Sequence, residues 1–453
     1  MKKSQRTILG LSGHCVRRWH APGGARWPWL GLAAGGLVGL VPVARGQYAL
    51  QVDDAYSSYV QGQRNESAGS RLGNYNVKLG PTGWKFGAGL ALQYTSNAGM
   101  TQNNPTGDFI FQPSGSATML WPISDQNSLT FNLTAGYLAY VKETDLSRFY
   151  INPGSALAFN IFVGDVRITL YNRASMSQSS YQNPTVGAGN AGYSSFQNAI
   201  GAMADWKLDK GSLNLGFEHL NYIQTGGNQN LLSYGNSASQ VVSAQAGYAV
   251  TPEITLGPQV GLTWINYQNA GAGDAFQWNA GVFGKWMLSE KMNLNGSLGY
   301  TVYSPNTSTG FSQLNQVLNQ STGSPYFQLA WSHQLNQVIN YSVNAGYTIT
   351  TGQYSSGPTQ AYNVGFGVNW NILRGYTLST PFNWYNGNGL YDFSRSYSWY
   401  SAGIILSRPI TKKLTASLGY NIYIYSSDQS LGNISANSNY TVNNVTLSGQ
   451  YSF

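Results

Sequence analysis

The chain has 453 residues, with 24 basic and 16 acidic side chains and only 9% charged residues. Soluble domains carry about 25% charged residues, so this composition argues against an ordinary soluble protein. Aromatic residues make up 14%, which argues against disorder, and after residue 46 no apolar run approaches the length of a membrane-spanning helix.

The first 46 residues are organised like a secretory signal peptide. They contain seven basic residues and no acidic one, an apolar run at Trp29–Val43, and small residues at Ala44 and Gly46 before a cut. A retained membrane anchor is the competing interpretation, but about 15 apolar residues are short for a span. Cleavage would remove Cys15, the only cysteine, so no disulfide is expected. It would also leave 17 basic and 16 acidic residues, so we expect no nucleic-acid partner.

After this segment, polar and apolar side chains alternate in runs of about ten residues, the length of a tilted strand that crosses a membrane. In residues 338–350, apolar side chains from Ile339 to Ile349 alternate with Asn, Ser, Gly and Thr, and 254–264 and 413–425 repeat the pattern. A soluble sandwich would carry charges on its polar faces, whereas these faces are neutral. The pattern indicates lipid on one face of a sheet and water on the other.

The alternation predicts an all-β fold, a transmembrane antiparallel up-and-down β-barrel of about 18 strands, with 16 or 20 as alternatives. Residues 73–80, if a further strand, would require a partner near 48–60 and a total of 20. The chain thus divides into a signal peptide (1–46), an N-terminal lead-in segment (47–83) and the barrel (84–453). The predicted strands are 84–95, 109–121, 128–141, 155–162, 166–173, 196–207, 212–223, 239–250, 254–267, 274–287, 291–303, 325–335, 338–349, 359–370, 375–385, 396–408, 413–426 and 440–453.

Short turns and long connections alternate between these strands. The turns contain Gly, Pro, Asn or a charged residue, as tight hairpins require. The long connections, such as 224–238 and 427–439, are rich in Ser, Asn, Gln and Gly. Two of them, 174–195 and 304–324, carry no charge, and we expect them to fold into the lumen as a polar, neutral constriction.

Tryptophan marks the same level of successive hairpins. Each of five Trp residues lies a few positions before a short turn, with Leu or Ile across the turn. Indole is half apolar and half hydrogen-bonding, so Trp gathers at membrane interfaces. This register favours an interfacial girdle over ordinary core aromatics. The predicted girdle consists of Trp121, Trp206, Trp286, Trp331 and Trp370.

Seven charged residues inside the predicted strands fall on the polar phase and none of these on the lipid phase, where a midplane Lys or Arg would cost about 2–4 kcal/mol. Five are basic and two acidic, which favours weak anion preference in a shared constriction. The alternative is that several are solvated charges at the rims. The predicted pore-lining residues are Lys85, Arg167, Arg173, Asp205, Lys207, Glu218 and Lys285.

Four tyrosines also fall on the polar phase: Tyr171, Tyr303, Tyr423 and Tyr425. Rings in that position would either stack against sugars in the lumen or lie at the rims. The sequence leaves both interpretations open.

The chain ends inside a patterned strand, with Val445, Leu447, Tyr451 and Phe453 on one side. This strand, the signal peptide and the Trp-turn hairpins resemble those of Gram-negative outer-membrane β-barrel proteins of the porin type, over roughly 84–453. In that family a terminal aromatic with alternating apolar residues is read by the barrel assembly machinery. The resemblance therefore implies an assembly signal at these four residues.

The resemblance also implies a porin-like channel in the outer membrane, with small hydrophilic solutes or ions diffusing passively through a polar lumen. Its partners would be outer-membrane lipid and lipopolysaccharide and, during biogenesis, the assembly machinery. Porins commonly form trimers, so a homotrimer is an open alternative to a monomer. We expect no cofactor and no metal.

Two other functions compete with a channel. A non-conducting barrel would act as an adhesin or structural protein. A lipid-modifying hydrolase would need a Ser and a His at the rim, and the chain after residue 46 has only His219 and His333. His219 follows Glu218 and resembles the His-containing strand of lipid A deacylase barrels, but Leu220 stands where the serine is expected. We therefore predict no enzyme.

Overall fold

The computed structural model describes residues 75–453 apart from 177–179, 184–189, 227–235, 269–273, 307–319, 352–357, 373–374, 390–395 and 432–433. The predicted signal peptide and most of the predicted lead-in segment lie outside the described residues, and so do the middle parts of the long connections 224–238 and 304–324. Within the described part of the chain, no helix is long and apolar enough to cross a membrane.

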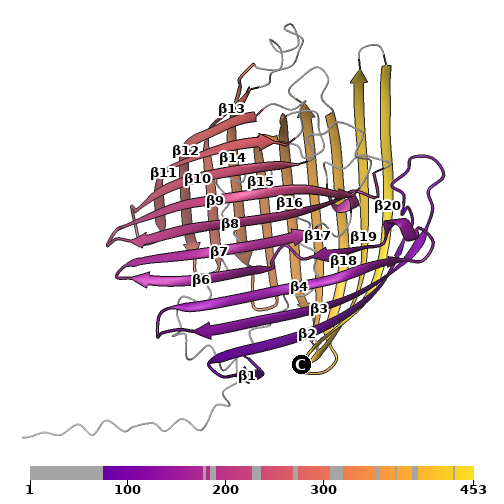
Figure 1. Ribbon diagram of the computed structural model, residues 1–453, viewed down its shortest axis with the longest axis horizontal. Coiled ribbons are helices and arrows are strands. Elements are labelled where there is room, and N and C mark those ends of the chain that lie inside the picture. Colours follow the sequence, from indigo (N-terminus) through magenta and orange to yellow (C-terminus); the bar gives the residue numbers. More distant parts are fainter. Residues whose placement is uncertain are drawn as a thin grey trace, which may run out of the picture. The chain divides into compact units, whose positions relative to one another are not determined.

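The described residues form 20 strands and two one-turn 3-10 helices (Figure 1). The elements are β1 (Val77–Leu79), β2 (Thr82–Thr95), β3 (Asp108–Pro122), β4 (Ser128–Tyr140), η2 (Thr144–Leu146), β5 (Arg148–Ile151), β6 (Ala156–Val163), β7 (Val166–Met176), η3 (Ser180–Gln182), β8 (Ser194–Lys207), β9 (Gly211–Gly226), β10 (Ser237–Ala249), β11 (Ile254–Tyr267), β12 (Asp274–Ser289), β13 (Met292–Asn306), β14 (Thr322–Gln334), β15 (Ile339–Thr351), β16 (Pro358–Ile372), β17 (Tyr376–Gly389), β18 (Ser396–Pro409), β19 (Leu414–Leu431) and β20 (Ile434–Ser452).

The strands form one closed antiparallel sheet in which neighbours in the chain are neighbours in the wall (Figure 1). β20 pairs with β19 on one side and with β2 on the other, from Gly87↔Ser452 to Thr95↔Asn444. Closure removes the exposed strand edges and pairs the backbone hydrogen-bonding groups inside the wall, as a lipid environment demands.

Two of the 20 described strands add no stave to this wall. β5 and β6 pair with successive parts of β4, from Leu138↔Arg148 to Asn132↔Ala156 and beyond, so together they form one stave. β1 pairs only with β2 among the described strands. The wall therefore has 18 staves, as predicted, and the described part of 73–80 contributes β1 to a short hairpin with the start of β2. The alternation does not predict β5, because the Pro153-Gly154 dipeptide that interrupts its stave is typical of a loop.

The last hairpin is longer than the sequence predicts (Figure 1). β19 and β20 pair as far as Leu431↔Ile434, so most of the connection expected at 427–439 is strand. Gly432-Asn433 is a dipeptide favoured in two-residue hairpin turns. The expectation of a loop was wrong because the Ser- and Asn-rich sequence of this stretch lacks the apolar alternation of the staves.

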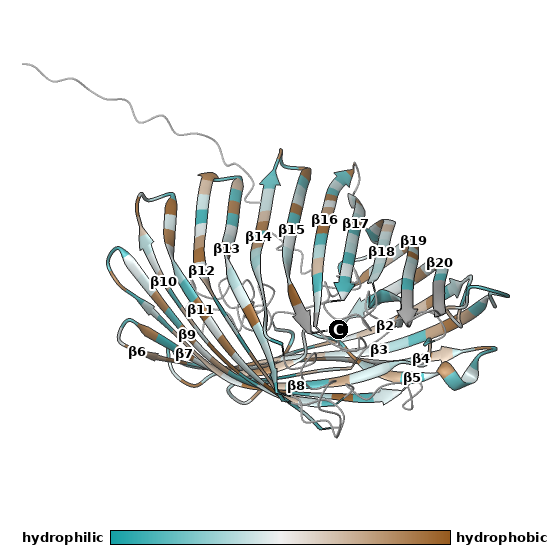
Figure 2. Ribbon diagram, turned by 90° about the horizontal axis from the view of Figure 1, so that it is seen from above, coloured by the Kyte–Doolittle hydropathy of each residue, from teal (hydrophilic) through white to brown (hydrophobic). Residues whose placement is uncertain are grey.

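Hydrophilic and hydrophobic residues alternate along the strands (Figure 2), and their side chains alternate between the two faces of the wall. Along β2, Leu90, Leu92 and Tyr94 are exposed on the outside, whereas Gln93 and Thr95 are buried on the inside. Most staves carry exposed large apolar side chains in the same way. Soluble monomers rarely expose a contiguous apolar surface of more than a few hundred Å², so this exterior fits lipid.

Candidate functional site

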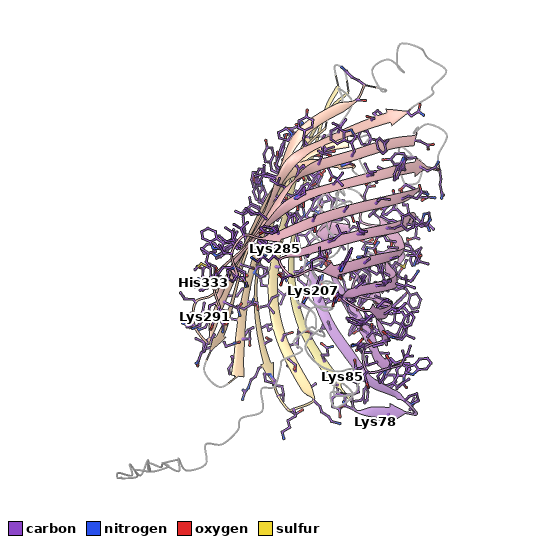
Figure 3. The ribbon with its side chains drawn as sticks, turned by 90° about the vertical axis from the view of Figure 1, so that its left-hand side faces the viewer. Lys78, Lys85, Lys207, Lys285, Lys291 and His333 are labelled. Atoms are coloured by element: carbon purple, nitrogen blue, oxygen red, sulfur yellow. The ribbon has the colours of Figure 1, made fainter. Side chains whose placement is uncertain are left out.

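The seven charged residues predicted to line a pore all point to the inside of the wall, where they divide into two groups. Lys85, Lys207 and Lys285 lie at the end of the barrel that carries the short turns, here called the turn end (Figure 3). They belong to β2, β8 and β12 and are therefore spread around the wall. Lys207 and Lys285 are exposed to water. The structure thus does not bring these three amino groups together.

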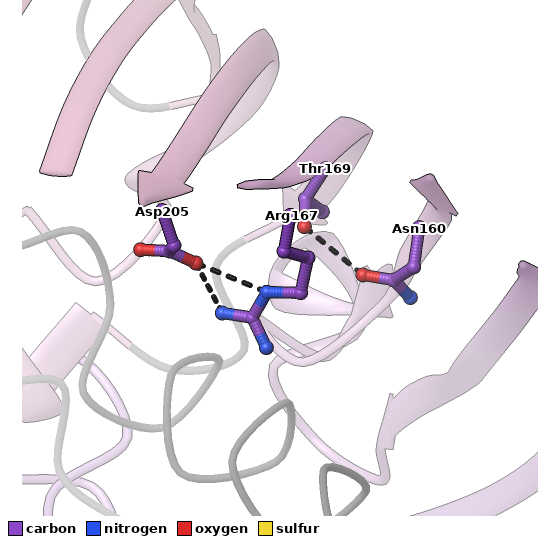
Figure 4. A network of polar contacts seen from close by, with 4 residues as sticks. All are labelled: Asn160, Arg167, Thr169 and Asp205. Atoms are coloured by element: carbon purple, nitrogen blue, oxygen red, sulfur yellow. Dashed lines mark hydrogen bonds and ion pairs between the residues drawn. The ribbon is translucent and has the colours of Figure 1, made fainter. Parts of the chain in front are cut away.

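The other four charges form two ion pairs. Arg167 of β7 and Asp205 of β8 face each other in register, and Arg167 Nε donates to Asp205 Oδ2 at 3.0 Å (Figure 4). Beside them, Thr169 Oγ1 donates to Asn160 Oδ1 at 2.9 Å. This first pair is neutral as a unit and belongs to a hydrogen-bonded patch of the inner wall.

The second ion pair joins Arg173 of β7 to Glu218 of β9, two staves away. The Tyr171 hydroxyl donates to Glu218 Oε2 at 2.7 Å, and the Arg173 guanidinium lies 5.2 Å from the centroid of the Tyr171 ring. Because both pairs are neutral, the excess of five basic over two acidic residues is reduced to the three lysines at the turn end.

The described parts of the connection between β7 and β8 lie in the interior. These parts, 180–183 and 190–193, are here called the inward segment. The Tyr181 hydroxyl accepts a hydrogen bond from Gln93 Nε2 on β2 at 2.7 Å. The backbone carbonyl of Tyr181 accepts another from Trp399 Nε1 on β18 at 3.1 Å. β7 and β18 are seven staves apart by the shorter way around the wall of 18, so the inward segment crosses to the far side of the interior.

Arg148 of β5 holds both parts of the inward segment. Its guanidinium donates to the Tyr193 carbonyl at 2.6 Å, to the Ala191 carbonyl at 3.1 Å and to the Ser180 hydroxyl at 3.3 Å. The Ser180 hydroxyl lies 2.6 and 2.8 Å from the same two carbonyl oxygens. One charged side chain therefore ties the segment to the wall.

Two inward charged residues escape prediction from the sequence, Arg148 and Asp108. The Asp108 carboxylate accepts the backbone N–H groups of Phe109, Lys142 and Glu143 at distances from 2.7 to 3.1 Å. It thereby fixes the start of the connection that leads to Arg148. Both residues stand at the first position of a strand, beside loop-like sequence, so alternation gave almost no signal for them.

Aromatic side chains pack around the inward segment at the end of the barrel with the long connections, here called the loop end. Tyr385, Tyr397, Tyr425 and Tyr440 stack across β17 to β20, with ring centroids 5.7, 6.0 and 5.0 Å apart. The Tyr181 ring joins this core 5.0 Å from that of Tyr423. The core fills part of the interior and fixes the inward segment.

The four tyrosines on the polar phase are buried, so they are neither rings exposed at the rims nor open platforms for sugars: Tyr171, Tyr303, Tyr423 and Tyr425. Tyr171 shows the reason. Its ring lies over Gly201 of β8, where an added Cβ would stand 2.5 Å from the ring. Glycine in a strand permits this close approach, and the aromatic ring covers the backbone that glycine leaves bare.

Exposure of the inward side chains changes partway along the wall. On β14, Ser324 and Tyr326 are buried near the loop end, whereas Ala330 and Ser332 are exposed near the turn end. β20 shows the same change after Asn444. On β14 and β20 the interior is therefore more open toward the turn end, here called the vestibule, whereas Leu120, Thr130 and Arg167 on other staves are buried near that end.

Across the interior from the ion pairs, the wall is neutral. Among the described residues of β14 to β20, no Lys, Arg, Asp or Glu side chain points inward. Asn383 Nδ2 donates to Ser401 Oγ at 3.2 Å, which is typical of the amide and hydroxyl contacts here. Amides offer both donors and acceptors to a passing solute. The half-exposed inward amides include Asn344, Asn363, Asn383 and Asn421.

The five tryptophans of the predicted girdle all point outward near the turn end. Trp286 lies in register between Ile254 and Leu294, and Trp331 lies beside Leu294 on the next stave. Four of the five are exposed, and Trp331 is half-buried against Tyr341, 5.3 Å away. Their contact with a membrane interface stays a prediction.

The end of the chain is fixed to the first stave. Phe453 N–H donates to the Phe86 carbonyl at 3.0 Å, and the Asn76 amide donates to the Phe453 carbonyl. The assembly role proposed for the terminal residues stays a prediction. All four point outward on β20 or just beyond it: Val445, Leu447, Tyr451 and Phe453.

Neither histidine shares a face with its neighbouring candidate partner. His219 points outward on β9, whereas Glu218 points inward to Arg173. His333 points outward, with Nδ1 2.8 Å from the Tyr341 hydroxyl, whereas Ser332 points inward. These two positions therefore form no Ser–His or His–carboxylate pair.

No family model and no curated protein matches the chain. Three solved structures are among those to which it is similar. OccAB3 of Acinetobacter baumannii is 10% identical with a TM-score of 0.44, covering 82% of this chain and 99% of that one. Pseudomonas aeruginosa OpdL is 11% identical with a TM-score of 0.43, covering 83% of this chain and 99% of that one. The Pseudomonas aeruginosa outer membrane protein opdK is 10% identical with a TM-score of 0.44, covering 82% of this chain and 99% of that one. Since these TM-scores are below 0.5, function is inferred from the barrel alone.

Proposed function

We propose that the protein is a channel of the Gram-negative outer membrane through which small hydrophilic solutes diffuse passively. The closed wall of 18 staves, apolar outside and polar inside, carries this proposal. Barrels of this strand number enclose more space than the side chains of the wall fill. Alternating faces suit lipid outside and water inside.

The inner wall favours small uncharged solutes. Two ion pairs cancel four of its charges, and the opposite staves present amides and hydroxyls that hydrogen-bond to polar solutes. The three lysines at the turn end give ions a weak anion preference. The inward segment narrows the loop-end half and sets the size limit.

Planar bilayers test this function. The chain without residues 1–46 is refolded, checked for heat-modifiable migration, and its single-channel current and reversal potential are recorded in a salt gradient. Stable open steps with weak anion preference are expected. A correctly folded protein that never conducts would overturn the channel.

The packed aromatic core favours a second candidate, a non-conducting barrel that acts as an adhesin or structural protein. Such a barrel would give no current, and deletion of its long connections would abolish binding to its partner. In either case we propose no catalytic role, outer-membrane lipid and lipopolysaccharide as surroundings, and insertion by the barrel assembly machinery through the terminal strand.

A further inference from the structure

Five polar side chains interrupt the apolar outside of the wall on four neighbouring staves, β7 to β10. Asn172 and Asn198 exchange side-chain hydrogen bonds at 3.1 and 3.4 Å. Asn198 faces Asn221 in register, and His219 faces Gln240. These five residues point outward and form one continuous surface, here called the outward polar patch.

The outward polar patch lies within the apolar band, toward its loop-end edge. Asn198 is eight residues along β8 from Trp206. With a rise of about 3.3 Å per residue and a tilt of about 40°, this places it about 20 Å above the tryptophan level in a band about 25 Å tall. Exposed apolar side chains flank the patch on both sides, Ile223 toward the loop end and Phe217 toward the turn end.

Three members of the patch, His219, Asn221 and Gln240, have no hydrogen-bond partner for their side chains in the part of the chain that the structure describes. Gln240 is exposed and the other two are half-exposed, so their donors and acceptors face the surroundings of the barrel. Lipid tails offer no hydrogen bond, and polar groups at this depth are stabilised when another protein surface pairs with them.

We propose that the outward polar patch binds the same patch on a second copy of the chain. This inference rests on the proposed membrane location and not on conductance. Amide and imidazole groups each offer a donor and an acceptor, so the patch is complementary to itself, and a two-fold axis along the membrane normal brings both patches to the same depth. Small outward side chains on the same staves allow close approach of the two walls: Ala174, Ala202, Ala204, Ala238, Ala244 and Ala246.

Charge argues against an anionic lipid as the occupant. No Lys or Arg side chain points outward from the described parts of β7 to β10, so a phosphate group would find no counter-charge there. A neutral surface of amides and one imidazole fits another neutral protein surface better than it fits a phosphorylated lipid.

Disulfide cross-linking tests the contact. The full chain with Cys15→Ser is expressed in a Gram-negative host, with Gln240→Cys on the patch or Tyr362→Cys as the control. Tyr362 points outward on β16, eight residues from Trp370, and Gln240 is likewise eight residues from Tyr248 at the turn end. Oxidation should convert the Gln240→Cys protein into a covalent dimer and leave the Tyr362→Cys protein monomeric. Equal cross-linking of both, or of neither, would overturn the proposal.

The combined variant His219→Leu, Asn221→Leu and Gln240→Leu supplies a second test. Leucine suits a lipid-facing position, so the variant should fold, migrate heat-modifiably and keep its single-channel current. Light scattering in detergent should show a roughly twofold loss of particle mass relative to the parent protein. A variant with the same particle mass as the parent protein would contradict self-association. A parent protein that is monomeric and associates only when lipopolysaccharide is added would contradict it as well.

Discussion

The two halves of the interior are built from the same alternating staves but differ in what fills them. In the loop-end half, the inward segment, held by Arg148, packs Tyr181 against Trp399 and Tyr423. Toward the turn end, inward side chains of β14 are open to water and Lys85, Lys207 and Lys285 lie at that end, whereas the Arg167–Asp205 pair there is buried. The inward segment contributes to this difference, so the size limit and the charge preference of the proposed channel should respond to different substitutions.

The packed half should be most sensitive at its buried ion pair. Glu218→Ala leaves Arg173 without its carboxylate and the Tyr171 hydroxyl without its acceptor. Removing one partner of a buried pair costs about 3–5 kcal/mol, which would appear as a lower urea midpoint for loss of the folded gel band. Glu253→Ala, in an exposed turn at the other end, is the matched control and should change stability by no more than about 0.5 kcal/mol. Equal effects of the two substitutions would erase the contrast between the halves.

Arg148→Ala should release the inward segment. Three hydrogen bonds from the guanidinium are lost and the carbonyls of Ala191 and Tyr193 lose a charged donor, at a cost of about 3 kcal/mol. Because the segment narrows the loop-end half, single-channel conductance should rise. Arg408→Ala is the control, since Arg408 lies on the outside at the turn end and donates to the Tyr376 hydroxyl. Unchanged conductance in Arg148→Ala would show that the narrowest point lies elsewhere.

A Phe→Ser substitution at Phe453, near the turn end, and at Phe149, near the loop end, should separate an effect on barrel assembly from an effect on lipid contact. Phe453→Ser changes the terminal residue that is bonded to β2, whereas Phe149→Ser changes an outward side chain of β5 that is 68% exposed. If the terminal aromatic is the assembly signal, only Phe453→Ser should lower the amount of folded barrel in the outer membrane. Quantitative immunoblots of outer-membrane fractions measure this, and equal amounts of both variants would remove the assigned role.

The contrast between the halves also marks what could be predicted from the sequence. Alternation depends only on neighbouring residues, so it predicted the 18 staves and the inward phase of Arg173 and Glu218 from local pattern alone. The pairing of these two residues across 45 positions of the chain depends on the register of the wall. The contact of Tyr181 with Trp399, across 218 positions, depends on the path of one connection. Such a connection has no periodicity to read. Arg148 was missed for the same reason, because Pro153-Gly154 hides its strand.

The smallest effect is expected in the open half. Replacing Lys85, Lys207 and Lys285 together by Gln keeps polar side chains at positions with access to water, so stability should change by no more than about 0.5 kcal/mol per site. The vestibule is not the narrow part, so conductance in concentrated salt should stay close to that of the parent. If these three amino groups carry the proposed anion preference, that preference should disappear in reversal-potential measurements. Gln substitutions of Lys412 and Lys413, which lie in an exposed turn between β18 and β19, should leave that preference in place. Anion preference that survives the triple change would move the selective charge into the packed half.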